Sequence, residues 1–184
     1  MDRVDFTKTK LPENDGLWAV VLDNVLTAAE CDQLVAAAEA QTDSTWERAM
    51  VNAGGGRQVT LTDVRNCGRI IWDDADVVAK IWARCAPHVP EIQKLDGWPK
   101  VTGLGPVKRK EIWEITRLNE RMRFLKYEGG EYFRPHCDGT YETPDGMERS
   151  MFTLHLYLND RTSNPQNPLL GGATAFHSMN MERD

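Results

Sequence analysis

The spacing of apolar positions changes along the chain. In the first half, apolar residues recur at helical spacing in two segments, one that begins after Thr27 and runs to about Ala40, and one from Asp73 to about Ala86. Positions three or four apart share one face of a helix, so both segments predict amphipathic helices. Thr27 and Glu30 have the spacing of a capping box, which satisfies the first free amides of the helix that follows.

From Glu111 onward, apolar and polar residues alternate, a pattern typical of half-buried strands. We predict strands at about 111–118, 121–127, 132–138, 151–158 and 172–177. Before Glu111, we predict short strands at residues 17–26 and 69–72. We predict a loop at 54–56, which consists of three glycines, and another at 95–110, which is rich in Gly, Pro and Lys.

Helices that precede antiparallel strands predict an α+β fold in which the helices pack on one sheet. We expect one domain over residues 1–184, with a helical support region at 17–110 and the first strands of the core at 111–184.

The predicted strand 151–158 has two different faces. Alternation places Thr153, His155 and Tyr157 on one face and four apolar side chains on the other, namely Phe152, Leu154, Leu156 and Leu158. We expect the apolar face to pack against the helices. The polar face fits either the lining of a ligand cavity or the exposed side of a one-sided antiparallel sheet.

Composition narrows the class of protein. The chain has 184 residues, 41% of them hydrophobic, which is enough for one core. The net charge of −6 disfavours nucleic acids and anionic membranes as partners, because both require clustered Lys and Arg. The four cysteines include no CxxC pair, and we expect them to be reduced thiols of a cytoplasmic protein. We find neither an apolar leader nor an apolar run of about 20 residues, so we expect no secretory signal and no membrane span.

The candidate chemistry lies at His136 and Asp138. They follow the turn at Gly129 and Gly130, and residues two apart on a strand leave the same face, so both side chains can converge on one ion. An imidazole and a carboxylate are two of the three ligands of the facial triad that holds non-heme Fe(II). Pro135 cannot donate to a strand ladder, which predicts an interruption or an edge beside His136 where a ligand can approach.

Four segments of the chain resemble one family. The segment 121–138, with Tyr127, the glycine turn, Tyr132 and His136-Cys-Asp138, is similar to the metal-binding segment of the prolyl 4-hydroxylase-like 2-oxoglutarate- and Fe(II)-dependent dioxygenases. The segments 153–159 and 171–176 resemble later core strands of that family, and 21–32 resembles its first strand and helix.

The resemblance implies a double-stranded β-helix (jelly-roll) core. In it, His136 and Asp138 would bind Fe(II), Tyr127 would hydrogen-bond the cosubstrate 2-oxoglutarate, and Tyr157 would line the cosubstrate pocket. His155 shares a predicted face with Tyr157, and we expect it to line the same pocket. The implied reaction hydroxylates a C–H bond of a peptidyl or small-molecule substrate with dioxygen, yields succinate and carbon dioxide, and often uses ascorbate to keep the iron reduced.

The chain departs from the family at its end. The family carries a second histidine beyond the segment that matches 171–176, followed by a Lys or Arg that binds the far carboxylate of 2-oxoglutarate, and this sequence stops at Asp184. We therefore expect the sequence to end early, and we interpret His177 as a hairpin-edge residue. The alternative function is a non-catalytic β-helix binding or scaffold module, or an inactive fragment of such an enzyme; a cupin-like metal protein is a third, weaker alternative.

Overall fold

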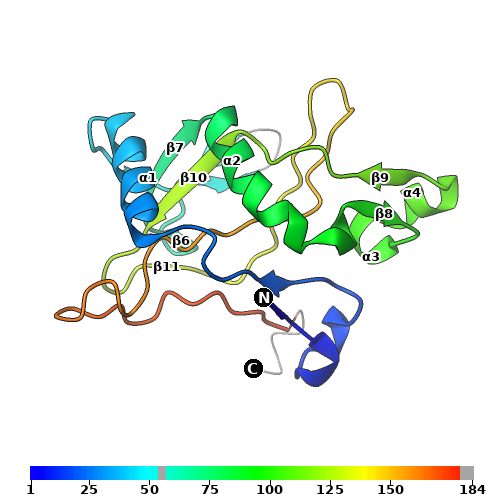
Figure 1. Cartoon of the computed structure of the whole chain (residues 1–184), viewed down its shortest axis with the longest axis horizontal. Helices are drawn as coiled ribbons and strands as arrows, with labels where there is room; N and C mark the ends of the chain where they lie inside the picture. Colours follow the sequence, from blue (N-terminus) through cyan, green and yellow to red (C-terminus); the bar gives the residue numbers. More distant parts are fainter. Residues whose placement is uncertain (54–56, 179–184) are drawn as a thin grey trace. The chain divides into compact units, whose positions relative to one another are not determined.

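A computed structural model gives the fold and describes residues 1–53 and 57–178. The helices in this part of the chain are α1 (Ala28–Ala40), α2 (Ala75–Cys85), α3 (Pro99–Thr102) and α4 (Leu104–Arg109), with the 3-10 turns η1 (Phe6–Lys8), η2 (Pro12–Asn14), η3 (Ala86–His88) and η4 (Pro90–Ile92) (Figure 1). The strands are β1 (Asp2–Arg3), β2 (Val20–Val21), β3 (Glu47–Arg48), β4 (Val51–Asn52), β5 (Gln58–Val59), β6 (Arg65–Asn66), β7 (Gly68–Asp73), β8 (Lys94–Asp96), β9 (Ile112–Glu114), β10 (Arg121–Lys126) and β11 (Tyr132–Phe133). The fold is α+β with small antiparallel sheets, as the order of patterns predicted.

Contacts divide the chain into two compact units. The first, which we call the sheet unit, consists of Leu26–Ala75 and Glu120–Ala175. The second unit consists of Met1–Val25, Asp76–Asn119 and Phe176–Asp184. Each unit combines segments from both sides of residue 110, and the single domain over 1–184 stays a prediction.

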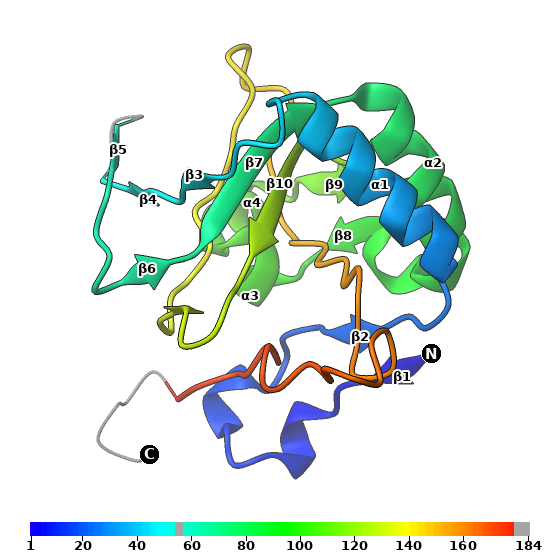
Figure 2. The same cartoon turned by 90° about the vertical axis from the view of Figure 1, so that its left-hand side faces the viewer.

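The sheet unit is built on β7, which lies between β10 and β3. β10 pairs with the whole of β7, from Arg121 opposite Asp73 to Lys126 opposite Gly68. Because side chains alternate across a strand, one face of this sheet carries Ile70 and Phe124, and α1 covers that face with Ala38 (Figure 2). These three residues form one buried hydrophobic cluster. The predicted strand at 69–72 and the packing of a helix on the sheet are both confirmed.

The helix α1 begins at the predicted capping box. The Glu30 amide donates to Oγ1 of Thr27 at 3.2 Å, and the Thr27 amide donates to Oε2 of Glu30 at 2.8 Å. Ala38 is fully buried, and its small side chain lets the helix backbone approach the sheet closely. The predicted helices at 28–40 and 73–86 are confirmed, the second as α2 within one or two residues.

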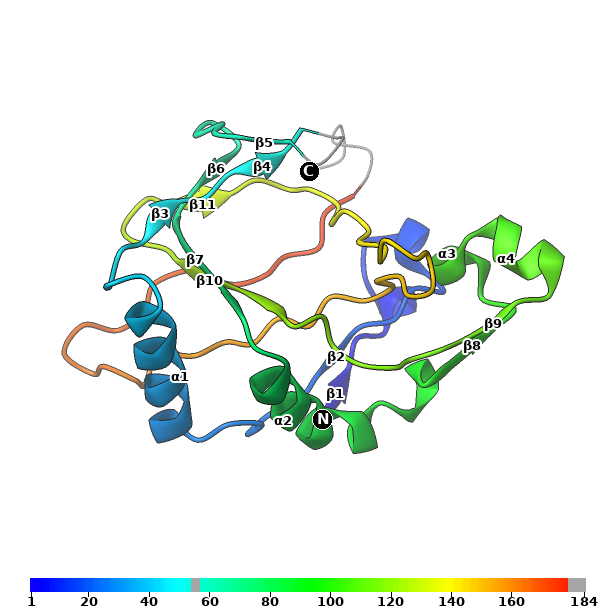
Figure 3. The same ribbon diagram turned by 90° about the horizontal axis from the view of Figure 1, so that it is seen from above.

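The predicted strand 132–138 is shorter than expected. Only β11 forms a ladder, with β6, where Tyr132 lies opposite Asn66 and Phe133 opposite Arg65 (Figure 3). Pro135 has no amide hydrogen, so the ladder cannot continue toward His136. The chain therefore leaves the sheet just before the candidate metal ligands.

The predicted strands 151–158 and 172–177 are wrong, because neither segment forms a ladder among the described residues. Alternating apolar residues indicate which side chains face a core, but a strand also needs a neighbouring backbone to bond with, and the alternation does not provide one. Leu158 packs against the core cluster as expected, whereas Leu154 is 40% exposed. The predicted apolar face of this segment is thus covered only in part.

In the second unit the prediction of a loop at 95–110 is wrong. This segment forms α3 and α4 and the end of β8, which pairs with β9. Pro99 stands at the first position of α3, where its missing amide hydrogen and fixed φ favour a helix start. The predicted strands at 17–26 and 111–118 shorten to β2 and β9, and the predicted loop at 54–56 lies outside the described residues.

No helix in residues 1–53 and 57–178 has the length and apolar character needed to cross a membrane.

Candidate functional site

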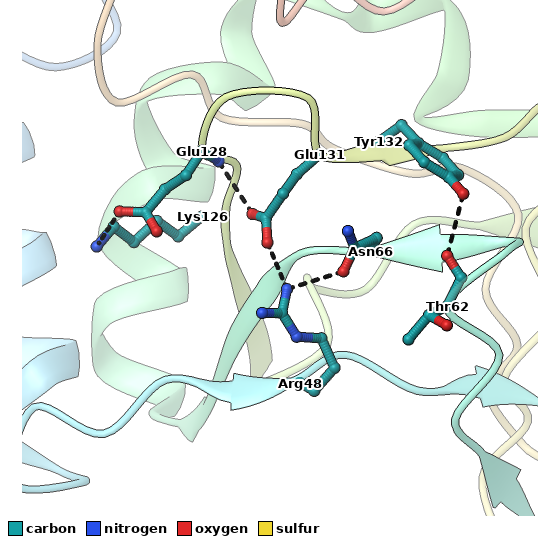
Figure 4. A network of polar contacts seen from close by, with 7 residues as sticks. All are labelled: Arg48, Thr62, Asn66, Lys126, Glu128, Glu131 and Tyr132. Atoms are coloured by element: carbon teal, nitrogen blue, oxygen red, sulfur yellow. Dashed lines mark hydrogen bonds and ion pairs between the residues drawn. The ribbon is translucent and has the colours of Figure 1, made fainter.

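The turn between β10 and β11 is fixed by a network of polar contacts (Figure 4). Glu131 forms an ion pair with Arg48 of β3, and it also accepts a 2.9 Å hydrogen bond from the amide of Glu128. Arg48 donates to Oδ1 of Asn66 at 3.0 Å, and Tyr132 donates to the carbonyl of Thr62 at 3.1 Å. These contacts fix the glycine turn, which precedes His136 in the sequence, against β3 and β6.

His136 stacks on the aromatic ring of Phe133. The two ring centroids lie 3.6 Å apart with an angle of 21° between the planes. Nδ1 of His136 lies 2.7 Å from the carbonyl oxygen of Arg134. A carbonyl oxygen only accepts, so this contact places a proton on Nδ1 and leaves the Nε2 lone pair of the neutral ring free to bind a cation.

The free nitrogen of His136 faces Asp138. Nε2 of His136 lies 3.5 Å from Oδ1 of Asp138, and the two side chains are 38% and 54% exposed. Because both atoms carry lone pairs when the imidazole is neutral, a proton or a metal ion between them stabilises the pair. The structure thus brings together the two residues that the sequence singled out.

The second oxygen of Asp138 is held by a residue far along the chain. Oγ1 of Thr153 donates a 2.6 Å hydrogen bond to Oδ2 of Asp138. One carboxylate oxygen is therefore fixed by a hydroxyl group, while Oδ1 faces the imidazole. This arrangement resembles the way outer hydrogen bonds orient metal ligands in proteins.

Tyr127 follows the end of β10. Cys67, a fully buried residue, lies close enough to its hydroxyl group to influence its pKa. Burial, with the neighbouring Cys67 second, raises the pKa of Tyr127 to about 12. Because 42% of the surface of Tyr127 is exposed, we infer that the buried part of the residue is its hydroxyl end, beside Cys67. The phenol stays protonated at neutral pH and can donate a hydrogen bond.

Tyr157 and His155 lie on the irregular segment 151–158. The hydroxyl of Tyr157 hydrogen-bonds Oγ1 of Thr174, so the segment that contains Tyr157 runs beside residues 171–175. His155 is exposed, two residues beyond Thr153. Neither residue contacts His136 or Asp138 by any bond recorded for the described residues, and their role at a cosubstrate pocket stays a prediction.

The donor atoms of the pair suit a divalent metal ion. Metal bonds from imidazole nitrogen and carboxylate oxygen are about 2.1 Å long in zinc sites, so two atoms that lie 3.5 Å apart can share one ion. Imidazole and carboxylate are also the ligand types that Fe(II) takes in facial triads. Residues 1–53 and 57–178 contain no group of three or more His, Cys, Asp or Glu side chains arranged to hold a metal, so the third ligand is not assigned.

Sequence reasoning missed two neighbours of the pair. Phe133 belongs to the same predicted strand as His136, and alternation alone would put them on opposite faces; the break at Pro135 lets the rings stack. Thr153 shares its predicted polar face with His155 and Tyr157, and this polar face was the sequence feature that could have indicated a residue near the site. The sequence did not show that Thr153 binds Asp138.

Comparisons with protein-family models, with curated proteins and with solved structures find no match for this chain.

Proposed function

We propose that the chain is a dioxygenase that depends on Fe(II) and 2-oxoglutarate and hydroxylates a C–H bond of a peptidyl or small-molecule substrate. One observation carries the proposal: Nε2 of His136, freed by the Nδ1 contact to the Arg134 carbonyl, lies 3.5 Å from a carboxylate oxygen of Asp138. The jelly-roll core implied by the family resemblance is part of the same proposal. The antiparallel sheet of β10, β7 and β3, with α1 on one face, is compatible with it.

In this proposal, His136 and Asp138 hold Fe(II), and the metal supplies activation of dioxygen and chelation of the keto acid when it is bound. The stack on Phe133 and the Arg134 carbonyl orient the imidazole, and Thr153 orients the carboxylate. Tyr127 stays protonated, and its hydroxyl group donates a hydrogen bond to the cosubstrate. Ascorbate would keep the iron reduced, as in the family that the sequence resembles.

The exposure of the pair supports access by small molecules. Both side chains reach solvent, so Fe(II), 2-oxoglutarate and dioxygen can approach without the opening of a core. The proposal includes both a peptidyl and a small-molecule substrate.

An anaerobic titration tests the proposal. The protein is titrated with Fe(II) and 2-oxoglutarate, and the visible charge-transfer band of the keto-acid chelate is recorded. We expect a saturable band that is lost in His136→Ala and kept in His88→Ala, a matched histidine change in η3 of the second unit. Absence of the band in the unaltered chain would support the non-catalytic binding module instead.

A further inference from the structure

The central strand β7 is paired along its whole length on one side only. On the other side, β3 pairs with the first two of its six residues, Gly68 and Arg69 (Figure 2). The remaining four residues, from Ile70 to Asp73, have no ladder partner on that side among the described residues. An open stretch of sheet edge can pair with an additional strand.

The backbone groups of Ile71 point toward this open side. Backbone groups of an antiparallel strand face its two neighbours in alternation. On the β10 side, the Asp74 amide donates to the Glu120 carbonyl at 3.0 Å. On the β3 side, the Ala49 amide donates to the Cys67 carbonyl at 3.0 Å. Odd-numbered residues of β7 therefore face the β3 side, and in residues 1–53 and 57–178 no hydrogen bond is recorded for the amide or carbonyl of Ile71.

The chain before β3 turns away from β7. If the register of β3 continued, Thr45 would lie opposite Ile71 and exchange backbone hydrogen bonds with it. Instead the Thr45 amide donates to the Thr42 carbonyl at 2.9 Å. Asp43 and Ser44, with φ angles of 47° and 59°, adopt the left-handed conformation that makes this turn. The turn leaves the position opposite Ile71 unfilled.

A hollow lies at this position. It has a volume of about 350 Å³ and is lined by Thr42, Thr45, Glu47, Arg69, Ile70 and Ile71. Arg69 is 2.7 Å from Glu47, and at the far end of β7 Arg121 is 2.7 Å from Asp73. Because each of these charges has its counter-charge, the edge favours an uncharged ligand.

We propose that this edge of β7 binds an extended, uncharged peptide segment of another protein. The segment adds a strand antiparallel to β7, in line with β3, and its central residue exchanges both backbone hydrogen bonds with Ile71. A β-branched residue of the segment packs beside the Ile71 side chain, as in other cross-strand pairs. Threonine hydroxyls of the hollow accept polar side chains at the alternate positions.

The length of the edge favours a peptide over a second copy of the chain. Four residues of strand span about 13 Å. Stable interfaces between folded proteins bury about 1,200–2,000 Å² in total, far more than one short ladder supplies. A peptide needs only the edge and the hollow.

Fluorescence anisotropy with a labelled acetyl-Thr-Val-Thr-Val-Thr-amide peptide tests the proposal on the full chain without metal. We expect saturable binding. The matched probe is the same peptide with its three central amides N-methylated, which keeps every side chain and removes the donors. It should bind at least tenfold more weakly, because the ladder cannot form. Added salt should leave the affinity unchanged, since no net charge is matched.

Two variants of the chain locate the binding site. Ile71→Pro removes an amide that faces the open edge, where proline is tolerated in a strand, and should weaken binding about tenfold. Circular dichroism checks that this variant keeps its fold. Thr45→Lys places a charge in the hollow and should weaken binding as much, whereas Thr60→Lys, at an exposed threonine outside the hollow, should not.

The proposal is overturned if the unmethylated peptide does not bind, if both peptides bind equally, or if Thr45→Lys and Thr60→Lys bind alike. A strong loss of affinity in salt would contradict the uncharged class of ligand. Analytical ultracentrifugation covers the remaining occupant: a dimer of the unaltered chain that Ile71→Pro dissociates would assign the edge to a second copy. None of these measurements uses iron, so their outcome is independent of the Fe(II) titration.

Discussion

The hydroxyl of Thr153 donates a 2.6 Å hydrogen bond to Oδ2 of Asp138, although the two residues lie 15 positions apart. The other oxygen of the same carboxylate faces Nε2 of His136. One side chain therefore joins the irregular segment 151–158 to the candidate metal pair, and its loss should free the carboxylate to rotate.

We predict that Thr153→Val weakens Fe(II) binding by about 10- to 100-fold, the effect of losing a hydrogen bond that orients a metal ligand. Thr153→Ser keeps the hydroxyl group and should retain most of the affinity. Anaerobic calorimetric titration with Fe(II) measures both variants. Equal affinity in Thr153→Val and the unaltered chain would show that the hydrogen bond does not orient a ligand.

The Tyr127 phenol should titrate late. Its pKa is raised from 10.0 to about 12 by burial and by Cys67, so the unfolded chain releases this proton first as the pH rises. The contribution of Tyr127 to folding is therefore complete below pH 10 and is lost as the pH rises through the folded value. Ultraviolet titration of the phenolates checks this, since Tyr127→Phe should remove a transition near pH 12. Removal of a transition near pH 10 instead would contradict the burial of the hydroxyl.

The two faces of β10 should differ in their effect on stability. Phe124 is 7% exposed in the core beneath α1, whereas its neighbour Leu125 is 39% exposed on the opposite face of the sheet. We expect Phe124→Ala to lower the free energy of unfolding by about 3–5 kcal/mol. Leu125→Ala should cost much less, because its side chain already contacts water. Urea unfolding measures both, and similar losses would mean that α1 does not cover the face assigned to it.

Loss of the capping box should destabilise α1. Thr27→Ala removes the oxygen that accepts from the Glu30 amide, and we expect a loss of about 0.5–2 kcal/mol in the free energy of unfolding. Thr27→Ser preserves the acceptor and is the matched control. Circular dichroism during urea unfolding follows both variants; a loss in the serine variant as large as in alanine would assign the effect to the methyl group.

The local features of the fold could be read from the sequence. Thr27 and Glu30 fixed the start of α1 because a capping box is made by residues three apart. The short apolar stretch at 69–72 marked β7. His136 and Asp138 were paired because residues two apart on a strand leave the same face, and they stay close although the ladder ends before them. Such features depend on a few neighbouring residues, and sequence spacing determines them directly.

Contacts between distant segments were decided by the tertiary structure. The pattern of 151–158 fitted a strand, yet a ladder needs a neighbouring backbone, and no pattern within the segment supplies one. The partners of Thr153 and of Arg65 were likewise hidden, since the hydrogen bond to Asp138 and the contact with Phe133 join residues that only folding brings together. The sequence by itself determined the helix cap, the central strand and the candidate ligand pair. Only the folded chain could place Thr153 beside Asp138 and Arg65 over Phe133, because such contacts depend on how distant parts of the backbone meet in space.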